Sequence, residues 1–127
     1  MHWNMTETLD QLGGDQALLD EVVEIFLEEA PKHLAALRLA VAHGTAETIE
    51  TNAHSLKGEL GYLGVPEISQ QAAQLEEMGR FNNVTGAASL FSQFEVDISG
   101  LFTSIRSAKA MALKAQVAAV DSSAVEQ

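Results

Sequence analysis

The longest hydrophobic repeat of the chain lies in its C-terminal third and has the spacing of an α-helix. From Ala87 onward, apolar residues recur at steps of four and three, which places them on one face of a helix. The stripe consists of Ala87, Phe91, Phe94, Ile98, Leu101, Ile105, Ala108 and Ala112. One helix cannot bury a stripe of this length alone, so other helices with matching apolar faces must cover it.

Three further segments upstream have the same helical spacing. We expect helices over about residues 15–41, 45–63 and 67–78. Their apolar stripes are Leu19, Val23, Phe26, Ala30, Leu34, Leu37 and Val41, then Ala46, Ile49, Ala53, Leu56, Leu60 and Leu63, then Ile68, Ala72, Leu75 and Met78. Pro31 lies inside the first pattern and predicts a kink or break near Ala30.

The two ends of the chain have weaker patterns. A short helix over about residues 6–12 is expected to cap the bundle, with Trp3 as an anchor. Residues 116–127 lack a clear stripe and are predicted to form a frayed or disordered tail. The sequence therefore predicts an all-α fold, an antiparallel four-helix bundle with a short additional N-terminal helix, formed by residues 1–115. The starting Met and the unpatterned tail favour a complete protein over a piece of a larger kinase.

The charge balance excludes several classes of partner. The chain has 7 Lys and Arg against 18 Asp and Glu, a net charge of −11, which argues against nucleic acid or an anionic membrane surface. It has no cysteine, no signal peptide and no apolar run near the roughly 20 residues that span a bilayer. We expect an acidic, cytoplasmic, monomeric protein.

The stretch AHSLKGELGYLG, residues 53–64, combines a histidine and a lysine with three glycines. At about 100° per residue, His54, Lys57, Gly58 and Gly61 share one face of the helix, well away from its apolar stripe. Neutral imidazole is a nucleophile near pH 7, and a neighbouring ammonium can offset the charge of a transferred phosphoryl group. Glycines leave the approach free of side chains. The pattern indicates phosphoryl transfer through His54.

This stretch resembles the signature of the histidine-containing phosphotransfer (HPt) domains of phosphorelays, and the similarity extends over about residues 15–110 through FLEEAPKHLAAL and QLEEMGR. The resemblance implies a phosphocarrier rather than an enzyme, without a nucleotide site or a cofactor of its own. It would accept a phosphoryl group from a receiver-domain aspartate, or from a histidine kinase, and pass it to the aspartate of another receiver. The receiver would supply Mg²⁺.

The same resemblance assigns roles to individual residues. His54 would be the phosphoacceptor through Nε2, Lys57 would stabilise the phosphoryl oxygens, and Glu76 would orient the imidazole. Glu50, one turn before His54 on the same face, is a rival for the orienting role. A docking surface is expected to include Gly58, Gly61, Tyr62 and Glu50 together with parts of the first long helix.

One departure from the family pattern leaves an alternative open. Small residues usually follow Lys-Gly, whereas this chain has Glu59 and Leu60. A bundle that binds a receiver or kinase without accepting phosphate is therefore the second hypothesis. The pairs Glu50–His54 and Glu29–His33 raise the question of a metal site, but the chain has no Glu-x-x-His motif of the di-iron bundles, so we expect none.

Overall fold

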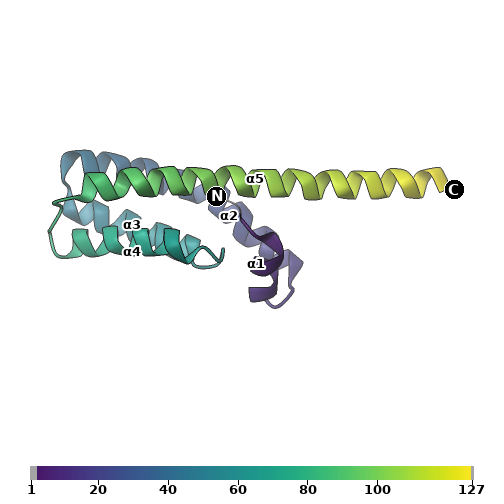
Figure 1. Cartoon of the computed structure of the whole chain (residues 1–127), viewed down its shortest axis with the longest axis horizontal. Coiled ribbons are helices and arrows are strands. Elements are labelled where there is room, and N and C mark those ends of the chain that lie inside the picture. The colour runs from purple at the N-terminus through teal and green to yellow at the C-terminus, as the bar shows by residue number, and fades with distance from the viewer. Residues whose placement is uncertain (1–2, 127) are drawn as a thin grey trace.

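The computed structural model describes residues 3–126, with side chains described as far as residue 118. It contains the helices α1 (Met5–Gln11), α2 (Gln16–His43), α3 (Ala46–Leu60), α4 (Pro66–Arg80) and α5 (Ala87–Glu126), and no strand within the described residues. Helix α3 packs against α2 and α4, and α5 closes the bundle against α2 and α4 (Figure 1). The predicted all-α bundle with a short N-terminal helix is confirmed.

Helix α2 runs through Pro31 without a break, so of the predicted kink or break near Ala30 the break is wrong. A proline removes one backbone hydrogen bond from a helix interior. Here the buried side chains of Ala30 and Leu34 hold the helix in the core on both sides of the proline. The packing of these side chains in the core therefore outweighs the free-energy cost of the missing backbone hydrogen bond.

The turn after α3 begins earlier than the apolar stripe predicts. Helix α3 ends at Leu60, and Gly64 adopts a left-handed φ of 68° in the turn that follows. Leu63 is nevertheless fully buried, and its carbonyl oxygen accepts hydrogen bonds from Trp3 Nε1 and Thr8 Oγ1, both at 3.0 Å. The N-terminal segment thus caps this end of the bundle, with Trp3 as the predicted anchor.

The predicted stripes meet in one core. Most of their residues are buried, and Phe102, which the stripe of α5 did not include, stacks on Phe26 with the ring centroids 4.9 Å apart. The end members Ala46, Val41 and Met78 are only partly buried. Ala112, near the end of the predicted stripe, is exposed.

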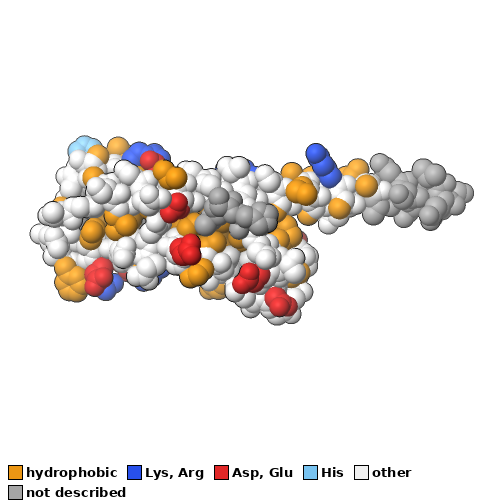
Figure 2. Space-filling model, viewed as in Figure 1, with side chains coloured by type: hydrophobic (Ala, Val, Ile, Leu, Met, Phe, Trp, Pro, Cys, Tyr) orange, Lys and Arg blue, Asp and Glu red, His pale blue; other side chains and the backbone are white. Residues whose placement is uncertain are grey.

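Helix α5 continues past the bundle, as Figure 1 shows. Residues 109–118 are exposed, and hydrophobic side chains lie along this extension (Figure 2). Residues 116–126 are helical in the structure, whereas the sequence predicts a frayed or disordered tail over residues 116–127. Alanine, lysine and glutamine have high helix propensity, so local hydrogen bonds can continue the helix without packing. Fraying of this segment stays a prediction.

No helix within the described part of the chain is both long and apolar enough to cross a membrane.

Candidate functional site

His54 lies midway along α3 and projects from the bundle. Its side chain is 68% exposed, whereas Ala53 and Leu56 beside it in the sequence are completely buried. The alternation follows from the helical period, because the apolar stripe of α3 faces the core and His54 lies off that stripe. The structure therefore places the imidazole where another protein can reach it, as the sequence predicts.

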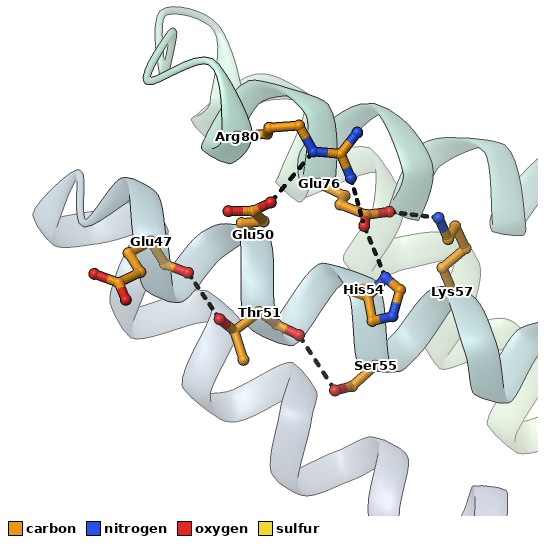
Figure 3. A network of polar contacts seen from close by, with 8 residues as sticks. All are labelled: Glu47, Glu50, Thr51, His54, Ser55, Lys57, Glu76 and Arg80. Carbon is orange, nitrogen blue, oxygen red and sulfur yellow. Dashed lines mark hydrogen bonds and ion pairs between the residues drawn. The ribbon is translucent and has the colours of Figure 1, made fainter.

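One nitrogen of His54 is held by a carboxylate from the next helix. Nδ1 lies 2.7 Å from Oε2 of Glu76 on α4. An ionised carboxylate only accepts hydrogen bonds, so Nδ1 carries the proton and donates it to Glu76. In the neutral ring Nε2 then keeps its lone pair. Figure 3 shows this second nitrogen pointing away from Glu76.

Glu76 is a buried carboxylate at the centre of a polar network. Its side chain is only 6% exposed, and Lys57 Nζ and Arg80 Nη2 approach its two oxygens at 2.5 and 3.1 Å (Figure 3). Burial raises the pKa of Glu76, but the hydrogen bonds and charges of Lys57 and His54 outweigh burial and leave the pKa below its usual value of 4.5. The carboxylate is therefore ionised at neutral pH and can stabilise positive charge on His54.

Glu50 does not contact His54. Its Oε2 lies 3.3 Å from Nε of Arg80, whose Nη2 also contacts Glu76 (Figure 3). Arg80 thus bridges the two carboxylates that the sequence analysis considered as rivals, and only Glu76 reaches the imidazole. Arg80 could not be selected from the sequence, since an arginine at the end of a helix has no spacing signal of its own.

Gly79 allows α4 to approach α3 closely at this site. A Cβ atom on Gly79 would lie 2.5 Å from the carbonyl oxygen of Ala46 and 2.6 Å from the amide nitrogen of Glu50. These distances are too short for any side chain. The helix expected over residues 67–78 extends to Arg80 in the structure, so Gly79 lies inside α4. A glycine within a helical pattern is the signal that could have revealed the close contact.

Gly58, near His54, is not packed against another helix in the way that Gly79 is. A Cβ on Gly58 would meet no atom within 4 Å, so the packing of this chain does not require a glycine there. Gly61 lies at the C-cap of α3, and Tyr62 in the following turn is 60% exposed. The bare surface at Gly58 leaves open the side of α3 next to His54.

A groove of about 450 Å³ opens beside His54, between α2 and α3. Residues from both helices and the turn line it: Val22, Ile25, Phe26, His33, His54, Ser55, Gly58, Glu59 and Tyr62. Gly58 and Tyr62 of the predicted docking surface therefore lie together with the imidazole. Glu50 lies on the α4 side of α3, with Arg80, and does not line the groove.

Glu59 turns toward α2. Its Oε1 lies 2.6 Å from Nδ1 of His33, and its side chain is 13% exposed. Burial raises the pKa of Glu59, the hydrogen bond and charge of His33 lower it, and Glu29 raises it, with a net rise above 4.5. Glu59 is thus paired with a histidine in the groove, a contact that the sequence analysis did not foresee.

The carboxylates and histidines of the described residues are the candidates for a metal centre. Among the described residues, no three of the side chains that bind metals lie close enough together to hold an ion. The polar groups at His54 contact one another: Glu76 pairs with the imidazole, with Lys57 and with Arg80.

Fold and site together define a class of protein: a helical bundle that presents an exposed histidine whose Nδ1 is held by a carboxylate. A family model, the Hpt domain, matches residues 21–123, and the chain belongs to that family. It is a histidine phosphotransfer protein of a phosphorelay, and its family exchanges phosphoryl groups with receiver domains and histidine kinases.

One solved structure extends the comparison. The chain is similar to the crystal structure of histidine-containing phosphotransfer protein B (HptB) from Pseudomonas aeruginosa PAO1, with a TM-score of 0.75 and 19% sequence identity. The match covers 87% of this chain and 96% of the other, so the two share the fold. No curated protein sequence matches the chain.

Proposed function

We propose that His54 is the residue that carries the phosphoryl group. The observation that supports this most directly is the hydrogen bond from Nδ1 to Glu76, which leaves Nε2 as an exposed nucleophile. In the transfer, the Nε2 lone pair attacks the phosphorus of a receiver's aspartyl phosphate. The N–P bond forms, the bond between phosphorus and the acyl oxygen breaks, and the aspartate leaves as a carboxylate. Nδ1 keeps its proton throughout, and Glu76 offsets the positive charge of the phosphorylated ring.

Lys57 and Gly58 would assist the same step. Lys57 Nζ contacts Glu76 and its side chain is 40% exposed, so a small rotation would bring the ammonium to the phosphoryl oxygens beside His54. Such a cation stabilises the negative charge that the transferred group carries in the transition state. Open space at Gly58 would allow the receiver's active site to approach the ring.

The protein would act as a carrier between partners. In this proposal it is a monomer that works in the cytoplasm, takes the phosphoryl group from a receiver domain or a histidine kinase and delivers it to a second receiver. It has no turnover of its own and needs no bound nucleotide or cofactor. The groove between α2 and α3 is the proposed docking surface for both receivers.

Labelling would test the assignment. Receiver domains charged with acetyl [³²P]phosphate are mixed with the wild-type protein, and we expect acid-labile, base-stable label on the protein. His54→Gln should abolish the label. His43→Gln is the matched control, because His43 is also an exposed helical histidine but binds only the carbonyl oxygen of Leu39. Full labelling of His54→Gln would refute the assignment. A wild-type protein that binds the receiver but takes up no label would favour the second hypothesis, a bundle that binds a receiver or kinase without accepting phosphate.

A further inference from the structure

The docking groove contains a second carboxylate–imidazole pair, His33 of α2 and Glu59 of α3. His33 Nδ1 faces Glu59 Oε1 at 2.6 Å, in the same groove that exposes His54. Both atoms are buried in the groove: neither His33 Nδ1 nor the other oxygen of Glu59, Oε2, makes a hydrogen bond of regular geometry, so the close approach of His33 to Oε1 is the contact that Glu59 makes. His33 is therefore the neighbour that covers the charge of this carboxylate.

An uncovered carboxylate at this position would oppose the proposed reaction. The incoming aspartyl phosphate is an anion, and like charges a few ångströms apart in a partly dry groove repel strongly. The chain already has a net charge of −11, and Glu29 adds a further negative charge near Glu59. Val22, Ile25 and Phe26 of α2 give another part of the groove wall an apolar character.

We propose that His33 is a positioning residue that covers the carboxylate of Glu59, so that a phosphorylated receiver can enter the groove although Glu59 lines it. The partner that fits presents apolar side chains to α2 and brings its phosphoryl anion past the covered carboxylate to His54. The inference rests on the proposed function of His54. It also explains how the chain keeps a glutamate where small residues are usual, since the charge is offset within the bundle.

A double-mutant cycle tests this inference through the receiver concentration needed for transfer. His33→Ala leaves Glu59 unpaired and should raise the KM for a phosphorylated receiver by about three- to tenfold at low salt. Glu59→Gln removes the charge and should lower the KM. His33→Ala/Glu59→Gln should return the KM to the wild-type value or below. Glu47→Gln is the charge-matched control, because Glu47 is exposed on α3 outside the groove.

Two further measurements separate an electrostatic role from a structural one. His33→Lys places an ammonium at this position and should keep the wild-type KM, and the defect of His33→Ala should shrink at about 0.5 M NaCl, where surface charges are screened. A thermal midpoint measured for each variant shows whether the bundle stays folded.

Three results would overturn the proposal. A folded His33→Ala protein with the wild-type KM would exclude a role for His33. A double variant as slow as His33→Ala, or a defect insensitive to salt, would show that the charge of Glu59 is not the cause. None of these three results contradicts the role of His54, provided that the wild-type protein takes up the phosphoryl label. If the wild-type protein takes up no label, both the proposed function and this inference are wrong.

Discussion

Gly79 of α4 lies directly against the backbone of Glu50 in α3, and this contact sets the distance between the two helices that build the site. A Cβ on Gly79 would lie 2.6 Å from the amide nitrogen of Glu50, well inside van der Waals contact. Three residues before Gly79 on α4, Glu76 reaches across the same interface to His54 at 2.7 Å. The glycine therefore makes the orienting hydrogen bond possible.

Gly79→Ala is expected to destabilise the protein and to slow phosphoryl transfer. The added methyl group forces α3 and α4 apart, at a cost of about 1–3 kcal/mol, although alanine is the better helix former by about 1 kcal/mol. Thermal unfolding measures the loss. Gly58→Ala is the control on α3, where the methyl group meets open space and should stabilise the helix. Equal thermal midpoints for the two variants would contradict the close packing at Gly79.

Lys57→Ala should slow transfer to His54 by about tenfold or more while the bundle stays folded. The variant removes a cation beside the phosphoryl group but leaves Arg80 to pair with Glu76. Single-turnover labelling and far-UV circular dichroism measure the two effects. Lys32→Ala, which removes an exposed lysine paired with Glu29, is the matched control and should transfer normally. A wild-type rate in Lys57→Ala would remove the lysine from the mechanism.

Glu76→Gln should change the tautomer of His54 and weaken the fold at neutral pH. The amide can no longer pair with Lys57 and Arg80 as a carboxylate does, and loss of a buried charged partner costs about 1–3 kcal/mol. Nitrogen chemical shifts of the His54 ring report the tautomer. If Nδ1 remains predominantly protonated in the variant, Glu76 does not orient the ring.

The same variant predicts a dependence of stability on pH. Because the pKa of Glu76 is lowered in the folded protein, its stabilisation is present above the usual value of 4.5 and is lost as the pH falls through the lower folded value. The difference in unfolding free energy between wild type and Glu76→Gln should therefore shrink below about pH 4.5. Denaturant unfolding at pH 7 and at pH 3 measures it, and a constant difference would disagree with the lowered pKa.

Gly58→Glu should block transfer sterically without unfolding the protein. The side chain would project into open space next to the groove, so the bundle tolerates it, but a receiver could no longer reach His54. Labelling should fall by at least about tenfold, whereas Gly58→Ala, with a smaller side chain, should lose less. Normal labelling of Gly58→Glu would show that receivers approach from another side.

The sequence by itself determined which residues form helices and which of their faces are buried. Helical spacing is a local property, so the stripes of α2 to α5, the exposure of His54 and its nearness to Lys57 and Gly58 follow from periodicity within one helix. It could not locate the end of α3 or the continuity of α2 through Pro31, because packing against neighbouring helices decides both.

Only the tertiary structure decided which side chains of different helices meet. The family resemblance suggested Glu76 as the partner of His54, and helical spacing suggested Glu50. The packing of α4 on α3 brought Glu76 to the ring, and Glu50 pairs with Arg80 instead. The pairing of Glu59 with His33 likewise depends on how α2 lies against α3. Such contacts depend on interhelical distances and rotamers, which arise when the whole bundle packs and leave no regular spacing along the chain.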